Sequence, residues 1–259
     1  MLILGIESSS LVASAAVLSD DKLIAEYTVN NAMTHSQTLL PMIDSVMKSA
    51  GADTTELDAI AISRGPGSFT GLRIGSATAK GLGLALNKPL VEVPTLDAMA
   101  YNLYGVTDRI ICPIMDARRS EVYSGAYVFE SQSSPSSGTD GNDSMEITYR
   151  LLTLIKENAG PVCELADKLN ECVMSSDGKY KGVIFLGDGV PAYRKLIAEK
   201  MQVGFSFAPE FLSRQRAASV AALGMEMFKQ GKTVSADDHA PEYLRMSQAE
   251  REAGKNTQK

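Results

Sequence analysis

A glycine-rich junction between a strand and a helix constrains this chain more than any other feature. The alternating run at 57–62 predicts a strand, and the proline-free segment at 70–86 predicts a helix. Between them, residues 63–69 read Ser-Arg-Gly-Pro-Gly-Ser-Phe. A strand that breaks into Gly-Pro-Gly and then opens a helix aims free backbone N–H groups and the positive end of the helix dipole at one point. Such a loop suits an anionic group or a closely approaching backbone, and a plain tight turn is the alternative.

The order of predicted elements repeats in the two halves of the chain. The first half gives three strands, a helix, a strand and the helix after the glycine junction, at 2–6, 12–18, 23–29, 35–50, 57–62 and 70–86. The second half gives the same order at 110–115, 121–129, 146–152, 161–174, 183–186 and, after Gly187-Asp188-Gly189, a helix to about 201. We therefore predict an α/β protein made of two βββαβα units with mixed sheets, a duplicated two-lobe fold with a cleft between the lobes.

This repeat sets the expected domain boundaries. We assign residues 1–107 to an N-terminal lobe and residues 108–212 to a C-terminal lobe. The segment 213–245, with a helix at 216–229, is expected to pack back across the lobe junction. The Ser- and Gly-rich insertion at 130–145 predicts a mobile hairpin extension, and the polar tail at 246–259 is expected to fray.

Length, charge and cysteine content limit the function classes open to this chain. Its 259 residues, 44% of them hydrophobic, suffice for two modest lobes with real cores. The formal net charge of −6 argues against broad electrostatic capture of nucleic acid. The three cysteines (Cys112, Cys163 and Cys172) form no metal-like cluster and cannot all pair, which fits a reducing cytoplasm. The N-terminus lacks a basic region and a long apolar run, so we expect neither a signal peptide nor a membrane span.

Several motifs in a fixed order carry a family resemblance. They are Gly-Ile-Glu-Ser-Ser at 5–9, the stretch 63–75, Met-Asp-Ala-Arg-Arg-Ser-Glu-Val-Tyr at 115–123, Gly-Asp-Gly at 187–189 and Pro-Glu-Tyr-Leu-Arg at 241–245. Together they resemble the TsaB (YeaZ) family from Met1 to about Arg245, with the Ser-rich insertion as the main departure.

The resemblance implies both a fold and a role. The family has the actin-like fold of the sugar kinase/Hsp70/actin superfamily, which agrees with the duplicated reading. Its members are non-catalytic dimerisation subunits in tRNA threonylcarbamoyladenosine formation. They pair with a catalytic paralogue, TsaD. An ATPase, TsaE, joins that pair, and tRNA is engaged indirectly. A cytoplasmic protein that forms a homodimer when alone is what this resemblance leads us to expect.

Two substitutions bear on metal binding. The catalytic paralogue carries two histidines four apart after the strand that follows its glycine-loop helix, and Thr95 and Met99 stand there in this chain. A hydroxyl and a thioether do not replace two imidazoles at an iron or zinc site. The two histidines present, His35 and His239, lie in different halves. We therefore expect no metal site and no metallopeptidase activity, and we expect His35 to be solvated or bonded to a turn.

Nucleotide binding has two open interpretations. Glu7 occupies the first phosphate-hairpin position of the superfold, where its carboxylate can hold hydrated Mg²⁺ and Ser8 and Ser9 can donate to phosphate. Gly187-Asp188-Gly189 would supply the second phosphate loop. In the other interpretation, both are tight turns left over from duplication. No Lys or Arg adjoins the first hairpin and the second loop is itself acidic, so we expect no cofactor beyond weak nucleotide binding.

Four arginines are candidates for binding a phosphate or a carboxylate. Arg118 and Arg119 lie in a predicted turn between two strands, where they suit an RNA phosphate, a partner carboxylate or, as we prefer, a surface or inter-lobe salt bridge. Arg64 and Arg73 bracket the first glycine loop. Because a cation is mildly unfavourable in the first turn of a helix, Arg73 is expected to answer a nearby carboxylate.

Two helices show a pattern that predicts partner binding. The second helix carries a ridge of small residues every four positions, next to one leucine: Gly71, Leu72, Gly75, Ala79 and Gly83. Each glycine in a helix costs about 0.5–1 kcal/mol relative to alanine, so the ridge favours a close approach by the sheet or another helix. The first helix has an apolar arc wider than one buried face needs: Leu39, Leu40, Met42, Ile43, Val46 and Met47.

These two helices are the surface that the resemblance assigns to TsaD and to the homodimer. Core packing explains either helix alone. For the pair we predict that Leu40→Asp or Met47→Asp breaks the complex and leaves the monomer folded.

The leading functional hypothesis is a pseudo-enzyme subunit that activates its catalytic paralogue. The alternative from another class is an ATP-dependent phosphotransferase or ATPase that uses the inter-lobe cleft.

Overall fold

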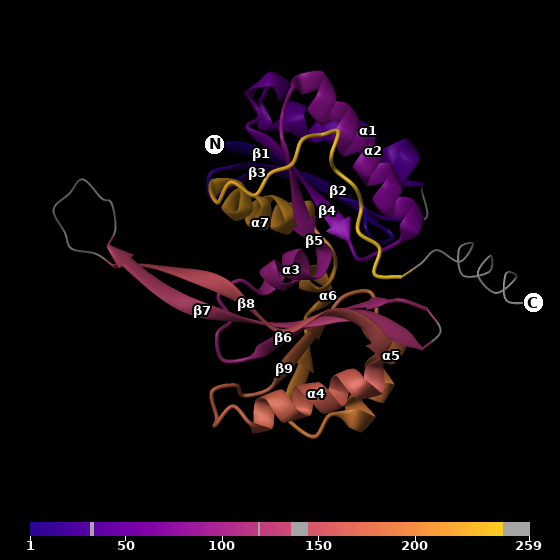
Figure 1. Ribbon diagram of the computed structural model, residues 1–259, viewed down its shortest axis with the longest axis vertical. Coiled ribbons are helices and arrows are strands. Elements are labelled where there is room, and N and C mark those ends of the chain that lie inside the picture. Colours follow the sequence, from indigo (N-terminus) through magenta and orange to yellow (C-terminus); the bar gives the residue numbers. More distant parts are fainter. Residues whose placement is uncertain (32–33, 119, 136–144, 246–259) are drawn as a thin grey trace, which may run out of the picture. The chain divides into compact units, whose positions relative to one another are not determined.

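The computed structural model describes residues 1–31, 34–118, 120–135 and 145–245. The chain divides into two compact units, one formed by Met1–Met99 with the segment from Arg214 onward and the other by Ala100–Ser213 (Figure 1). The second unit thus begins earlier than the expected residue 108. The reason lies in its packing, since the rings of Tyr101 and Tyr104 lie 5.5 and 5.2 Å from that of Phe129.

The first unit is built on a mixed five-stranded sheet with the order β3-β2-β1-β4-β5. Its strands are β1 (Leu2–Glu7), β2 (Val12–Ser19), β3 (Lys22–Asn30), β4 (Ala59–Gly65) and β5 (Leu90–Pro94). The first three form an antiparallel meander, whereas β4 pairs in parallel with both β1 and β5. The carboxyl ends of β1, β4 and β5 therefore meet at one edge, where the glycine junction lies.

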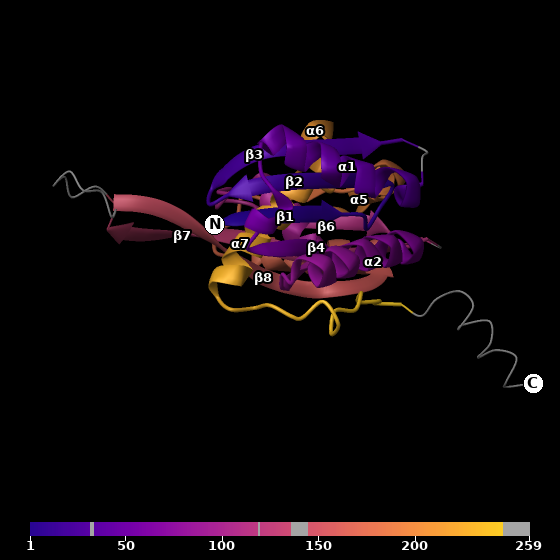
Figure 2. The ribbon, with the colours of Figure 1, turned by 90° about the horizontal axis from the view of Figure 1, so that it is seen from above.

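Helices cover both faces of this sheet. On one face, α1 (His35–Ala50) and α2 (Phe69–Leu86) bury Leu4 and Ile6 (Figure 2). On the other face, α7 (Ala217–Lys229) packs on Ile3 and Ala61. The alternation of side chains along β1 thus supplies two cores, as expected for a strand covered on both sides.

Short elements complete the first unit. They are the 3₁₀ turn at Thr54–Glu56, α3 (Thr95–Ala100) and an extended C-terminal segment after α7. Val234 in that segment pairs with Leu90 of β5. The helix expected to pack across the lobe junction thus belongs to the first unit, where it has its own sheet face.

The second unit has its own five-stranded sheet with the order β10-β9-β6-β7-β8. Its strands are β6 (Ile110–Asp116), β7 (Glu121–Pro135), β8 (Met145–Pro161), β9 (Val183–Leu186) and β10 (Phe205–Phe207). Its helical elements are the 3₁₀ turn Tyr101–Leu103, α4 (Val162–Met174), α5 (Val190–Lys200) and α6 (Glu210–Ser213). Apolar residues of β6, β9, α4 and α5 form its core.

Read in reverse, the second sheet matches the first strand by strand: β8-β7-β6-β9-β10 against β3-β2-β1-β4-β5. Both contain an antiparallel meander and two parallel pairings. The predicted α/β class with a repeated βββαβα unit is confirmed. β10 and α6 were not predicted, because three or four residues leave no periodic pattern.

The Ser-rich insertion lies within a long hairpin of the second unit. β7 runs to Pro135 and β8 begins at Met145, and these two residues are paired. The predicted hairpin extension is confirmed for the paired arms. Residues 136–144, on which the expectation of mobility falls, lie outside the described residues, as does the tail 246–259.

Candidate functional site

The first glycine junction is filled by the β1–β2 turn. The backbone N–H of Ser68 donates to the carbonyl of Ser9 at 2.6 Å, and a Cβ added to Gly67 would lie 2.3 Å from that same oxygen. At the next turn, the N–H of Gly71 donates to the Ser68 hydroxyl at 3.3 Å. The N–H groups of Ser68, Gly71 and Leu72 thus have protein acceptors. The sequence left open an anion site, a closely approaching backbone or a plain tight turn. The structure supports the second of these, because the β1–β2 turn approaches this loop closely.

The turn that fills the junction contains the predicted phosphate-hairpin residues. Glu7, Ser8 and Ser9 are buried. The Ser8 hydroxyl donates to the carbonyl of Gly71 at 3.0 Å, and the N–H of Ser9 donates to Glu7 Oε1 at 2.5 Å. Burial raises the pKa of the Glu7 carboxyl, and hydrogen bonds from Ser9 oppose that rise in part. The Ser8 hydroxyl and the backbone N–H of Ser9 are thus engaged inside the first unit.

The second glycine loop is also engaged within its own unit. Gly187 has a φ of 112°, which a residue with a side chain rarely adopts, and its N–H donates to the Ser213 hydroxyl at 3.0 Å. The N–H of Gly189 donates to the carbonyl of Ile114 at 3.1 Å, and Asp188 between them is half-buried. The two backbone donors that would cradle a phosphate here already have acceptors.

The positions of the paralogue's metal ligands lie in the interior. Thr95 and Met99 are 0% and 1% exposed. His35 is buried, and its Nε2 lies 2.7 Å from the carbonyl oxygen of Ser10 in the β1–β2 turn. Of the two expectations for His35, bonding to a turn is therefore confirmed. Among the described residues, no group of three or more His, Cys, Asp or Glu side chains is placed to hold a metal ion.

The apolar arc of α1 is core rather than partner surface. Leu39, Ile43, Val46 and Met47 are at most 3% exposed and pack in the core below α1 and α2. Met42 is 8% exposed, so Leu40, at 56%, is the one exposed residue of the six in the arc. The other five fill the space between the helix and the sheet, and on this arc the prediction of partner contact rests on Leu40.

The small-residue ridge of α2 is likewise explained inside the chain. A Cβ added to Gly71 or Gly75 would lie 2.1 Å from the backbone oxygen or the hydroxyl of Ser8, and one on Gly83 would lie 3.0 Å from Ala236 Cβ. Leu72 and Ala79, the two other predicted contacts, are at most 1% exposed. The β1–β2 turn and the C-terminal segment occupy this ridge, which favours close packing within the chain over contact with a partner.

A different face of α2 points outward. Ala77, Gly81, Leu84 and Ala85 are exposed, and a Cβ added to Gly81 would meet nothing within 4 Å. Leu84 is 56% exposed, as is Leu40 on α1. This face of small and apolar residues was not predicted as a partner surface, although Ala77, Gly81 and Ala85 follow the same four-residue spacing as the buried ridge.

The C-terminal motif at 241–245 closes over the glycine junction. The N–H of Glu242 donates to the carbonyl of Arg64 at 2.7 Å, and Arg64 Nη2 pairs with a Glu242 carboxylate oxygen at 2.9 Å. A Cβ added to Gly65 would lie 2.2 Å from the Glu242 carbonyl oxygen. The motif is visible in the sequence, but its contact with the glycine junction was not predicted, because no pattern in either segment indicates that the two are neighbours.

The turn after β6 holds Arg118 in a left-handed conformation, with a φ of 65°. Its N–H donates to Asp116 Oδ1 at 2.8 Å, and the Tyr193 hydroxyl donates to the same oxygen at 3.2 Å. The predicted salt bridge is loose, with Arg118 Nε 4.0 Å from Asp116 and the arginine side chain 87% exposed. Burial, followed by the charge of Asp116, raises the pKa of Tyr193. Arg119 lies outside the described residues.

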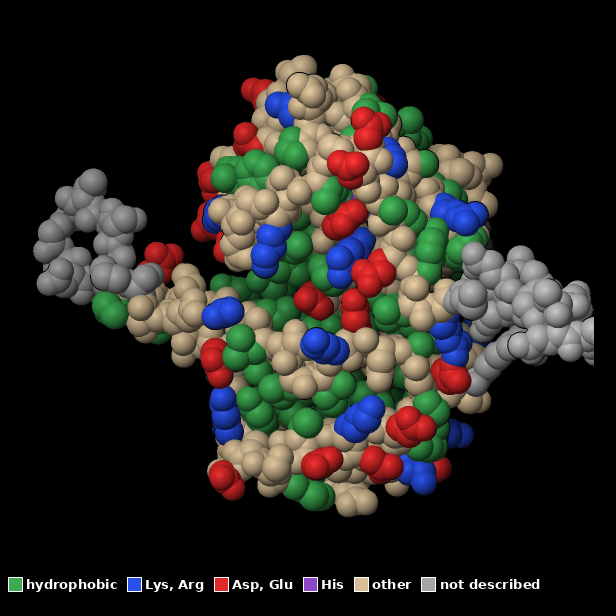
Figure 3. Space-filling model, viewed as in Figure 1, with side chains coloured by type: hydrophobic (Ala, Val, Ile, Leu, Met, Phe, Trp, Pro, Cys, Tyr) green, Lys and Arg blue, Asp and Glu red, His purple; other side chains and the backbone are tan. Residues whose placement is uncertain are grey.

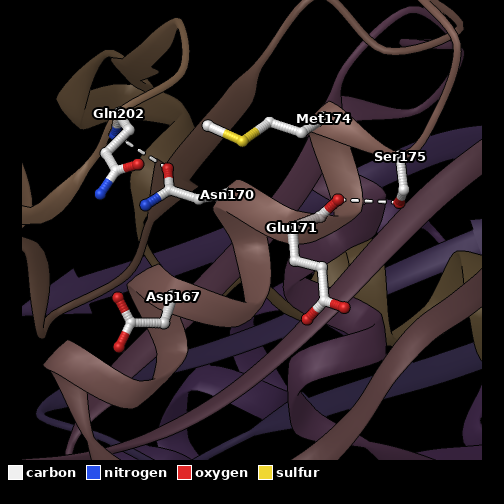
Figure 4. Close-up of a pocket in the computed structure, with 6 residues that line it drawn as sticks. All are labelled: Asp167, Asn170, Glu171, Met174, Ser175 and Gln202. Atoms are coloured by element: carbon white, nitrogen blue, oxygen red, sulfur yellow. Dashed lines mark hydrogen bonds between the residues drawn. The ribbon is translucent and has the colours of Figure 1, made fainter.

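An open surface pocket of about 500 Å³ lies at the end of α4 (Figure 4). Its polar groups bond mainly to one another. Gln202 N–H donates to Asn170 Oδ1 at 2.8 Å, and the Ser175 hydroxyl donates to the Glu171 carbonyl at 2.8 Å. Asp167 and Glu171 add two carboxylates without a lining cation. These contacts tie α4 to the chain after α5, and we assign the pocket no chemistry.

The surface shows no large basic field on the face in Figure 3, where Lys and Arg are interspersed with Asp and Glu. Within the described residues, no helix is both long enough and apolar enough to cross a bilayer.

Comparison with known proteins identifies the chain's relatives. The family model "TsaD: tRNA N6-adenosine threonylcarbamoyltransferase" matches residues 22–253. The tRNA threonylcarbamoyladenosine biosynthesis protein TsaB of Haemophilus influenzae is 32% identical over 215 residues, covering 82% of this chain and 80% of the relative. TsaB of Bacillus subtilis is 29% identical over 252 residues, covering 96% of both chains.

A solved structure shares the fold. It is an uncharacterized protein from Pseudomonas aeruginosa with similarity to peptidase YEAZ, 25% identical to this chain, with a TM-score of 0.69. The alignment covers 94% of this chain and 99% of that one.

Proposed function

The chain belongs to the TsaB family of tRNA threonylcarbamoyladenosine biosynthesis proteins, and from that premise we propose that it is a non-catalytic subunit of a threonylcarbamoyltransferase complex. In this role it binds a catalytic paralogue of the TsaD type and orders the active site of that paralogue. An ATPase of the TsaE type joins the pair, and tRNA is engaged mainly through the catalytic subunit.

The observation that carries the non-catalytic part is the filled glycine junction. Ser68 N–H is bonded to Ser9, and Ser9 N–H is bonded to Glu7, so the groups that would receive a phosphate serve the fold of the first unit. In the second unit, the N–H groups of Gly187 and Gly189 are bonded in the same way. A helix start and its backbone donors bind anions only when those donors face the ligand.

The buried Thr95 and Met99 support the same proposal. Neither residue is a suitable ligand for iron or zinc, and both side chains sit in the core instead of facing a site. The catalytic metal chemistry implied for the paralogue therefore has no counterpart at these positions.

The outward face of α1 and α2 supports partner binding. Leu40 and Leu84 expose large apolar side chains, and Ala77 and Gly81 leave room for a second helix to approach closely. A subunit that docks there can raise the rate of a partner's reaction by favouring its active conformation, without contributing a reacting group.

Binding to the catalytic paralogue tests this proposal. We expect the purified chain to form a stoichiometric complex with the paralogue, and we expect Leu84→Asp to weaken it while Leu154→Asp, an exposed leucine of the second unit, leaves it unchanged. A parallel titration with ATP and Mg²⁺ examines the alternative. Micromolar ATP affinity with turnover, together with no complex, would favour a phosphotransferase or ATPase.

A further inference from the structure

Two aromatic rings orient one exposed arginine at the start of α2. The Arg73 guanidinium carbon lies 3.9 Å from the centroid of the Phe69 ring, and Arg73 Nε donates to the Tyr243 hydroxyl at 3.2 Å. The Phe69 and Tyr243 rings are themselves 4.7 Å apart. The C-terminal motif thus fixes the direction of a side chain from a distant part of the sequence.

This arginine stands where a cation is unfavourable. It lies near the N-terminus of α2, close to the positive end of the helix dipole. In the part of the chain that the structure describes, no carboxylate lies within ion-pair distance of Arg73, so the sequence-based expectation of one is wrong. The nearby carboxylate of Glu242 pairs with Arg64 instead. Arg73 bonds to Tyr243 through Nε, and no ion pair of its two terminal nitrogens is found with the residues that the structure describes.

The residues around Arg73 have the composition of a protein-binding hot spot. Tyr243 is 38% exposed, Phe69 is half-buried, and Leu11 at the tip of the β1–β2 turn is 76% exposed. The bond from Ser68 to Ser9 brings that turn against the start of α2. Tyrosine and arginine dominate binding energy when apolar neighbours exclude water around them. We call Leu11, Phe69, Arg73 and Tyr243 the arginine–aromatic surface.

We propose that Arg73 in this surface binds a carboxylate of the catalytic partner. The inference rests on the proposed function and names one contact of that complex. A guanidinium that lies over a ring and is bonded through Nε can offer its two terminal N–H groups to a carboxylate in a bidentate pair. An RNA backbone fits less well, because it takes several cations, and here a single available arginine lies near Glu242 on a chain of net charge −6.

Calorimetric titration of the full-length chain with the catalytic paralogue tests the contact. We expect Arg73→Ala to raise Kd about tenfold or more and Arg73→Lys to raise it less, because an ammonium cannot pair bidentately. Tyr243→Phe keeps the ring and removes the hydroxyl that holds Nε, so Kd should rise several-fold. Arg150→Ala, at an exposed arginine of the second unit, is the matched control and should bind as the wild type does.

Each outcome decides between this inference and its premise. If the wild type binds and the Arg73 variants bind equally well, the carboxylate contact is overturned and the proposed function stands. If the wild type shows no binding, both fall. If Arg73→Ala leaves partner affinity unchanged and weakens binding to tRNA, the ligand is a phosphate and the inference is again overturned. Unchanged thermal melting of the variants shows that the losses are local.

Discussion

His239 Nδ1 lies 2.7 Å from Glu92 Oε1, and this contact fastens the C-terminal segment to the middle of β5. The His239 side chain is fully buried, and Glu92 Oε1 also accepts from the N–H of Ala240 at 3.4 Å. Lys80 on α2 adds bonds to the carbonyls of Asp237 and His239. The segment that reaches the arginine–aromatic surface is thus held by several hydrogen bonds to α2 and β5.

We predict that Glu92→Ala loosens this segment. The substitution leaves a buried imidazole nitrogen without its partner, which costs about 1–3 kcal/mol. Hydrogen exchange at the Leu90 and Val234 amides should accelerate, because these two residues bond to each other across the segment. Asp44→Ala is the control. It removes an exposed ion pair with Lys48 and should change unfolding free energy by about 0.5 kcal/mol or less.

The close approach of Ser8 to α2 predicts opposite effects of alanine at two glycines of one helix. At Gly71, a Cβ would lie 2.1 Å from a backbone oxygen, so Gly71→Ala should destabilise the protein by about 1–3 kcal/mol or more. At Gly81 the surroundings are open, so Gly81→Ala should stabilise it by about 0.5–1 kcal/mol. Urea unfolding measures both. Equal effects of the two substitutions would contradict the packing described for the ridge.

The raised pKa of Glu7 predicts that stability falls with rising pH. The folded protein holds a proton on Glu7 more tightly than the unfolded chain, whose ordinary value is 4.5. The favourable contribution is full below that value and is lost as the pH rises through the folded pKa. Glu7→Gln removes this dependence, so its stability relative to the wild type should increase as the pH rises above 4.5 through the folded pKa of Glu7. A constant difference across that range would show that burial does not govern the titration of Glu7.

Two aspartate substitutions, Leu40→Asp and Met47→Asp, distinguish surface from interior on α1. From the sequence, both substitutions were predicted to break the complex and leave the monomer folded. In the structure, however, Leu40 is 56% exposed and Met47 is 3% exposed. Leu40→Asp should leave the melting temperature nearly unchanged and weaken the complex with the paralogue. Met47→Asp should unfold the first unit, because an unpaired carboxylate in the core costs several kcal/mol, on the order of 3–5. Circular dichroism melts with binding measurements check both.

Local signals in the sequence predicted most of the fold. The helix at 35–50 is predicted to the residue, and Gly51 after it adopts the expected left-handed conformation with a φ of 64°. The repeat of elements predicted the duplicated topology. By contrast, β4 begins at Ala59 and not at Leu57, because residues 54–56 form a 3₁₀ turn before it.

The candidate site was less predictable, because its contacts join distant segments. The spacing of Gly71, Gly75 and Gly83 predicts that another segment packs closely on α2, but it does not identify that segment. In the structure, Ser8 and Ala236 are the residues that pack there. The same holds for Arg73, for which a carboxylate was expected and a tyrosine was found. Sequence periodicity indicates which face of a helix packs closely, and only the tertiary fold determines which residues it packs against.

We propose that this chain activates a partner and contributes no chemistry of its own. The decisive experiment is threonylcarbamoyl transfer to tRNA by the catalytic paralogue, the ATPase and the threonylcarbamoyl donor, with this chain present or omitted. The account predicts product only when the chain is present, reduced product with Leu84→Asp, and full product with Glu7→Gln. Equal product in its absence, or loss of product with Glu7→Gln in a folded protein that still binds the paralogue, would contradict it.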